Sequence, residues 1–189
     1  MTTRWQIVGM LVVLTVTGSG SARGQSSKVA PSDAPATIAL TRRSEPGVAL
    51  RISGTLVTGP GRTPVAGASI YVYQTDAGGA YTPTNPRDSD HPRIHGYLRT
   101  DRLGRYAFTT VRPGSYPNTT NPGHIHYQVV APGYRDRVFE IVFAGDTLIP
   151  AQWLRDASNE LAAVAVVRLE RTADGGWHGI HDVVLRPDP

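Results

Sequence analysis

Short stretches in which apolar and polar residues alternate constrain the fold of this 189-residue chain more than any other feature. Successive side chains of a β-strand point to opposite faces of its sheet, so this alternation is typical of strands with one buried face. Turns rich in Gly and Pro separate the stretches, and the chain contains 20 Gly and 15 Pro. The expected strands lie in residues 48–57, 68–76, 105–111, 124–130, 136–144, 163–172 and 178–187.

The number of short strands, with almost no helix between them, predicts the fold class. Only residues 151–164, AQWLRDASNELAAV, have a pattern that allows a helix, and that helix would be short. We therefore expect an all-β fold, an antiparallel β-sandwich with long active-site loops and little helix. The turn ADGGW at 173–177 predicts a hairpin, whereas residues 76–97 are too many for a hairpin turn and mark a loop that can carry function.

The N-terminal residues differ from the rest and suggest three segments. A basic start, an apolar run and small residues in 1–24 have the layout of a secretory signal peptide, which implies a secreted or periplasmic protein without a stable membrane span after cleavage. A retained membrane anchor is the alternative. Residues 25–46 are rich in Ser, Ala and Pro and are expected to be a flexible leader, followed by the sandwich in 47–189.

Composition excludes several classes of function. The chain has no cysteine, which excludes disulfides, Cys-ligated metal sites and thiol catalysis. Its net charge of +4 includes Arg4 and Arg23 of the expected signal peptide, and the remaining basic residues are scattered. We therefore expect no nucleic-acid partner, because such partners require clustered Lys and Arg.

Four residues stand out as candidates for metal binding. His124 and His126 would share one face of a strand, because they are two positions apart. Tyr81 and Tyr116 follow glycine-containing turns, in GGAY and PGSY. A phenol is a poor ligand at neutral pH, but a trivalent cation favours the phenolate. Taken separately, the histidines also fit a polar strand face or a zinc site, and the tyrosines fit apolar caps over the sandwich.

Three longer motifs carry a resemblance to a known family. They are PVAGASIYVYQTDAGGAYTP, HGYLRTDRLGRYAFTTVRPGSYP and GHIHYQVVAPGYRDR, which is followed by FAGD. Together they resemble the intradiol ring-cleavage dioxygenases, the family of protocatechuate 3,4-dioxygenase and catechol 1,2-dioxygenase. The resemblance extends from about residue 48 to 185 and covers the core domain of that family.

The resemblance implies a fold, a metal and a reaction. It implies a β-sandwich that holds mononuclear non-haem Fe(III) through Tyr81, Tyr116, His124 and His126, with no organic cofactor. The partners would be a catechol-type substrate and O2, and the oligomeric state stays open. Tyr116 would be the catalytic residue, displaced by the substrate and accepting its proton. The ring would then be cleaved between the two hydroxyl-bearing carbons to give a cis,cis-muconate.

Two positions depart from the family pattern. Asn121 stands where the family usually has Arg, three residues before the first His, and Glu140 stands where a Gln is usual. An ionised carboxylate near a catecholate is unfavourable, so Glu140 requires either a raised pKa or a different role. Two alternatives to an active dioxygenase therefore stay open. One is a non-catalytic member of the same architecture, and the other is a transthyretin-like or carboxypeptidase-regulatory-like binding module.

Overall fold

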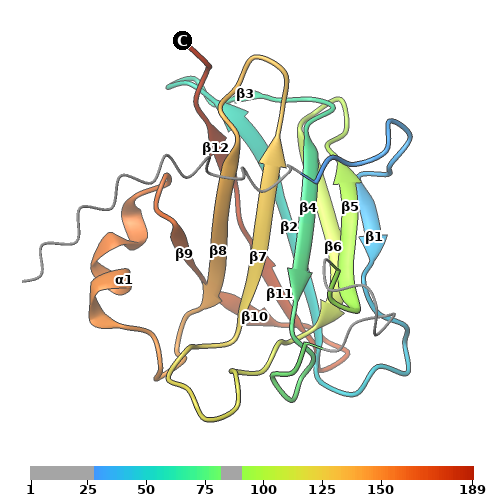
Figure 1. Ribbon diagram of the computed structural model, residues 1–189, viewed down its shortest axis with the longest axis vertical. Coiled ribbons are helices and arrows are strands. Elements are labelled where there is room, and N and C mark those ends of the chain that lie inside the picture. The colour runs from blue at the N-terminus through green and yellow to red at the C-terminus, as the bar shows by residue number, and fades with distance from the viewer. Residues whose placement is uncertain (1–27, 82–90) are drawn as a thin grey trace, which may run out of the picture.

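The computed structural model describes residues 28–81 and 91–189, which form two β-sheets packed face to face (Figure 1). The expected signal peptide in 1–24 lies outside the described residues. One sheet contains, in spatial order, β5 (Ile94–Arg99), β4 (Ser69–Gln74), β7 (His124–Val130), β8 (Arg137–Phe143) and β9 (Val164–Val167). The other contains β1 (Thr37–Ala39), β6 (Arg105–Val111), β2 (Ala49–Thr58), β11 (Trp177–Ile180) and β10 (Leu169–Arg171), with β12 (Val183–Leu185) and β3 (Thr63–Pro64) also paired to β2.

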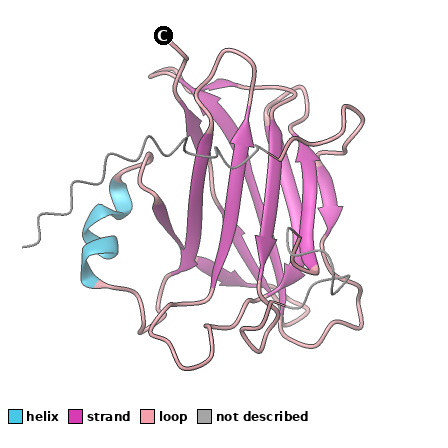
Figure 2. Cartoon of the chain, viewed as in Figure 1, coloured by secondary structure: helices cyan, strands magenta, loops and turns pink. Residues whose placement is uncertain are grey.

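The predicted all-β sandwich is confirmed, with some parallel pairing in addition. Most neighbouring strands are antiparallel, including the predicted β10–β11 hairpin, but β1–β6, β2–β11, β2–β12 and β8–β9 are parallel. In the described residues the helical content is α1 (Ala151–Arg155) and a 3-10 turn, η1 (Asp156–Ser158), beside β9 (Figure 2). No helix in this described part is long and apolar enough to cross a membrane.

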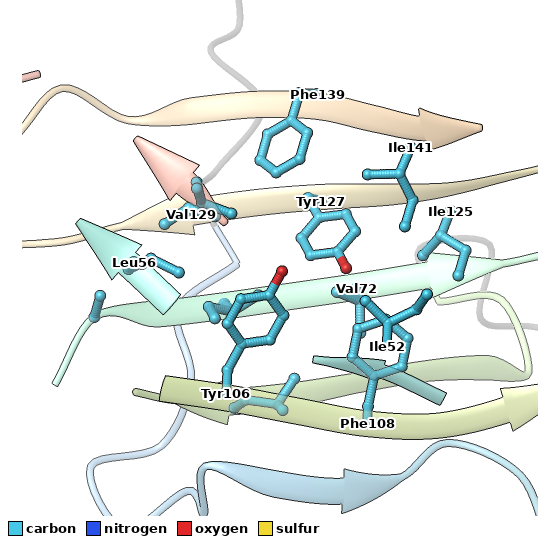
Figure 3. Close-up of a cluster of buried hydrophobic side chains, with 14 of the residues drawn as sticks. Ile52, Leu56, Val72, Tyr106, Phe108, Ile125, Tyr127, Val129, Phe139 and Ile141 are labelled. Atoms are coloured by element: carbon cyan, nitrogen blue, oxygen red, sulfur yellow. The ribbon is translucent and has the colours of Figure 1, made fainter. Parts of the chain in front are cut away.

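The core lies between the two sheets and follows from the alternation of the strands. On β7, Ile125, Tyr127 and Val129 are fully buried and face β2 and β6. Tyr127 stacks on Phe139 of the neighbouring β8, with ring centroids 4.8 Å apart (Figure 3). The intervening residues of β7, which include His124 and His126, must therefore point to the outer face of the five-stranded sheet.

The segment expected to be a flexible leader instead contains a strand. β1 pairs in parallel with β6, and Ala30 upstream of it is buried. Arg99 donates hydrogen bonds of 2.7 Å to the carbonyls of Ala30, Pro31 and Gly67, which ties the segment to the sandwich. Residues 28–46 therefore belong to the packed structure as far as they are described, and the prediction of a flexible leader is wrong for them.

A histidine with a buried ring nitrogen lies at one end of this core. His181 follows β11, and its Nε2 is buried without a hydrogen-bond partner among the described residues. The ring lies 5.4 Å from that of Phe139 and 6.2 Å from that of Tyr127. Burial, with a smaller contribution from the nearby Arg137, lowers the pKa of His181 from 6.5 to about 4. The folded protein therefore holds this imidazole in its neutral form at neutral pH.

We expect His181 to make the folded state less stable in mild acid. As the pH falls below 6.5, His181 of the unfolded chain becomes protonated, whereas in the folded protein it stays neutral until about pH 4. The contribution of His181 to the free energy of unfolding should therefore decrease across this window by up to about 3 kcal/mol and change no further below it. In His181→Phe this decrease should be absent in urea titrations at successive pH values, whereas His178→Gln should retain it. Equal slopes for His181→Phe and wild type would contradict the assignment.

Candidate metal centre

Four polar side chains meet at one end of the sandwich, where three chain segments converge. Tyr81 follows β4, Tyr116 lies in the connection from β6 to β7, and His124 and His126 open β7. Figure 1 shows these segments at the same end of the molecule, the lower end in that view. The structure thus brings together all four residues that the sequence singled out.

The polar atoms of these side chains form a closed ring. The hydroxyls of Tyr81 and Tyr116 lie 2.9 Å apart, and the two Nε2 atoms of His124 and His126 lie 3.0 Å apart. The Tyr116 hydroxyl is 3.0 Å from Nε2 of His124, and the Tyr81 hydroxyl is 2.9 Å from Nε2 of His126. Neighbouring donors on one first-row metal ion, each about 2 Å from it, are separated by about 3 Å. The spacing of the ring is therefore the spacing of ligands around one ion.

The hydrogen bonds behind the ring of donors fix the tautomer of both imidazoles. Nδ1 of His124 lies 2.8 Å from the carbonyl oxygen of Pro122, and Nδ1 of His126 lies 3.1 Å from Oε1 of Glu140. A carbonyl or carboxylate oxygen only accepts, so each Nδ1 carries the proton and donates it. In the neutral imidazoles each Nε2 is therefore a bare lone pair that points into the ring.

The ring has four close polar contacts but too few protons to make each of them a hydrogen bond. With both Nε2 atoms bare, the hydroxyl protons of Tyr81 and Tyr116 are the two available for four contacts of 2.9–3.0 Å. The contact between the two Nε2 atoms brings lone pairs together, which is repulsive unless a cation lies between them. A metal ion bound by two imidazoles and two phenolates would satisfy all four contacts, so the residues present fit such an ion.

Two phenolates at this position would need a highly charged ion to stabilise them. Burial raises the pKa of both Tyr81 and Tyr116 above 10, and the nearby charge of Glu140 raises them further. Neither phenol is therefore ionised at neutral pH by its protein surroundings alone. A trivalent cation supplies the charge that stabilises two phenolates, and hard oxygen donors suit it.

Backbone contacts between the two tyrosine loops hold the ring in place. Oδ1 of Asp76 accepts hydrogen bonds from the amides of Gly78 and Ala80, at 2.9 and 3.0 Å, and closes the turn before Tyr81. The amide of Gly114 donates to the carbonyl of Asp76 at 2.9 Å, which joins this turn to the loop of Tyr116. The GGAY and PGSY motifs are therefore one packed unit of two loops.

Two residues around the ring were missed or misjudged at the sequence level. The pKa of Glu140 is lowered by its hydrogen bond to His126, which excludes the first of the two alternatives, a raised pKa, and leaves a different role. Tyr73 of β4 stacks on His126, with ring centroids 4.2 Å apart and an angle of 8°. Both residues stand opposite His126 in neighbouring strands, and this register appears only when the strands are paired in the fold.

Asn121, the other departure from the family pattern, lies in the loop before β7. The residue is exposed, and its backbone N–H donates to Oγ1 of Thr119 at 3.3 Å. The position therefore supplies no cationic group to the ring.

Comparison with known proteins gives a consistent picture. Residues 25–187 match a family model described as "Dioxygenase". The protocatechuate 3,4-dioxygenase beta chain of Burkholderia cepacia is 31% identical over 140 residues, which cover 67% of this chain and 60% of the relative. The chlorocatechol 1,2-dioxygenase of Rhodococcus opacus is 27% identical over 144 residues, covering 67% of this chain and 55% of the relative. The chain thus spans little more than half the length of these two curated relatives.

One solved structure matches this chain over almost the full length of the solved domain. It is the dioxygenase domain of a dioxygenase carbohydrate-binding protein fusion from Streptomyces sp. SirexAA-E, with 27% identity and a TM-score of 0.62. The match covers 86% of this chain and 96% of that domain. These matches do not favour the transthyretin-like or carboxypeptidase-regulatory-like alternative.

Proposed function

Because the chain belongs to the intradiol ring-cleavage dioxygenase family, we propose that it is a non-haem Fe(III) enzyme that cleaves a catechol-type ring between its two hydroxyl-bearing carbons. The second substrate would be O2 and the product a cis,cis-muconate. The observation that carries the proposal is the ring of two phenol oxygens and two bare Nε2 atoms spaced 2.9–3.0 Å apart.

The metal and the protein would contribute different parts of the chemistry. Ferric iron supplies a Lewis acid and a template that can hold both oxygens of the substrate. His124 and His126 bring neutral donors whose orientation is fixed by the Pro122 carbonyl and by Glu140. Tyr81 and Tyr116 bring negative charge, which offsets two of the three charges of the ion.

Tyr116 is the residue to which we assign proton transfer. A catechol must lose protons to bind through both oxygens, and a general base within reach of the hydroxyl accelerates that step. Burial raises the pKa of Tyr116, so its phenolate would be a strong base if the substrate displaced it. The pKa of Tyr81 is raised as well, so the choice of Tyr116 rests on its place in the PGSYP motif that resembles the family.

We also propose that the protein acts outside the cytoplasm, in the periplasm or as a secreted enzyme. The support is the pattern of residues 1–24, with a basic start, an apolar run and small residues before Gln25. N-terminal sequencing of the protein recovered from extracytoplasmic fractions tests this. A mature chain that begins at Gln25 is expected, and an uncleaved chain in the membrane fraction would support the anchor instead.

The activity is tested by visible and ultraviolet spectroscopy of residues 25–189 loaded with iron in air. A phenolate bound to Fe(III) gives a red charge-transfer colour, which catechol should perturb. The band should shift and then recover while a muconate-like ultraviolet absorption appears. Colour without product would favour the non-catalytic alternative, and protein that stays colourless with no bound iron would overturn the four-ligand centre.

A further inference from the structure

Glu140 stands directly behind one of the two imidazoles. It is the cross-strand partner of His126 in the antiparallel pair β7–β8, and both side chains lie on the outer face of the five-stranded sheet. Oε1 of Glu140 lies 3.1 Å from Nδ1 of His126, and the two side chains are 33% and 17% exposed. The carboxylate therefore contacts the imidazole on the side away from the ring of donors.

The His126 imidazole is held from both neighbouring strands. Tyr73, which stands opposite His126 on β4, stacks on the face of the imidazole, with ring centroids 4.2 Å apart. His124, by contrast, donates its Nδ1 proton to the neutral carbonyl of Pro122. The two imidazoles of the centre thus differ in their Nδ1 acceptors, because a carboxylate lies behind His126 and a neutral carbonyl behind His124.

This charge changes the total charge around the centre. Two phenolates, from Tyr81 and Tyr116, and the carboxylate of Glu140 bring three negative charges, which equals the charge of a trivalent ion. A carboxylate that accepts the distal N–H of a ligating His fixes its tautomer and raises its basicity. A more basic, negatively charged ligand set stabilises the trivalent state of a metal more than the divalent state.

We propose that Glu140 is a positioning residue for the metal centre, which fixes the tautomer of His126 and makes the centre selective for a trivalent over a divalent ion. The inference depends on the proposed function only in placing iron at the ring of four donors. It assigns to this chain a carboxylate–histidine pair behind the four donors.

The test uses the iron-loaded protein and separates charge from hydrogen bonding. Glu140→Gln keeps an oxygen that can accept from Nδ1 but loses the charge, whereas Glu140→Ala loses both. Glu170→Gln is the matched control, because it removes the same charge from an exposed position on β10 in the other sheet. The measurements are the energy of the charge-transfer band and the ratio of Fe(III) to Fe(II) affinity.

In Glu140→Gln we expect full iron content and a charge-transfer band at longer wavelength. The ratio of Fe(III) to Fe(II) affinity should be roughly tenfold lower, which corresponds to a rise of about 59 mV in the one-electron reduction potential. Glu140→Ala should also bind Fe(III) roughly 10- to 100-fold more weakly, since the orientation of His126 is lost. Glu170→Gln should match wild type in all three quantities.

Two results would overturn the inference. If Glu140→Gln matched wild type and Glu170→Gln in both band and affinity ratio, Glu140 would be an ordinary strand residue. If Glu140→Gln lost iron as completely as His124→Ala, Glu140 would be a direct ligand. A coloured wild-type protein that forms no muconate would refute the proposed function alone, because the band and the affinity ratio still decide the role of Glu140.

Discussion

Tyr116→Phe is expected to lower kcat for catechol cleavage by about 100-fold or more while the protein still binds iron. The substitution removes one phenolate and the base that accepts the substrate proton, and a positioned general base contributes about 10²–10⁴ in rate. Three ligands stay in place, because Tyr81, His124 and His126 are held by their own contacts. Iron content and turnover should therefore separate in this variant.

Proton release distinguishes the loss of a base from a merely weakened centre. When catechol is added without oxygen in weakly buffered solution, Tyr116→Phe should release about one more proton per site than wild type, because no phenolate accepts it. Tyr134→Phe removes a hydroxyl from a turn far from this loop and should behave as wild type in rate and proton release. Equal proton release by Tyr116→Phe and wild type would refute Tyr116 as the acceptor.

The strands and the four candidate ligands could be predicted because their signals are local. The range 105–111 was predicted as a strand and is β6, and 124–130 is β7. Alternation needs only the stretch itself, and it also places His124 and His126 on one face. The tyrosines were found through GGAY and PGSY, turns that stand out in the sequence without any knowledge of the fold.

β1 and β5 were missed together, because each depends on the other. The inner face of β5 offers Ile94 and Leu98, but Gly96 between them has no side chain to complete the alternation. A Cβ on Gly96 would lie 2.5 Å from side-chain atoms of both Ile38 and Leu40, which fill that space from the N-terminal segment. This complementarity joins residues almost sixty positions apart, and no local pattern contains it.

The role of Glu140 could not be predicted for a similar reason. Seen in the sequence, it is a carboxylate near an expected catecholate, and this led to the expectation of electrostatic conflict. The register of β7 and β8 places it on the far side of His126 from the donor ring. Its charge then orients a ligand and does not need to be neutralised, which only the paired strands reveal.

Gly79→Ala is expected to abolish stoichiometric iron binding and to lower the free energy of unfolding. Gly79 has φ +82°, and a Cβ at this position would lie 1.8 Å from the carbonyl oxygen of Ser115. Positive φ alone costs a non-glycine residue about 1–3 kcal/mol. The contact adds a displacement, because the loop before Tyr81 must move away from the loop of Tyr116. The two phenol oxygens, now 2.9 Å apart, would then no longer face one ion.

Gly133→Ala separates these two causes, because Gly133 also has positive φ, +80°, but open space around it. It should lose stability through backbone strain alone and keep full iron content and the wild-type charge-transfer band. Titration with Fe(III), followed by urea unfolding of the same samples, measures both quantities in both variants. If Gly79→Ala bound iron as tightly as Gly133→Ala, the ring would be held by the sheet and by the metal itself. Loss of iron in Gly79→Ala alone would instead show that the close approach of two loops forms the centre, with the strands supplying only its two histidines.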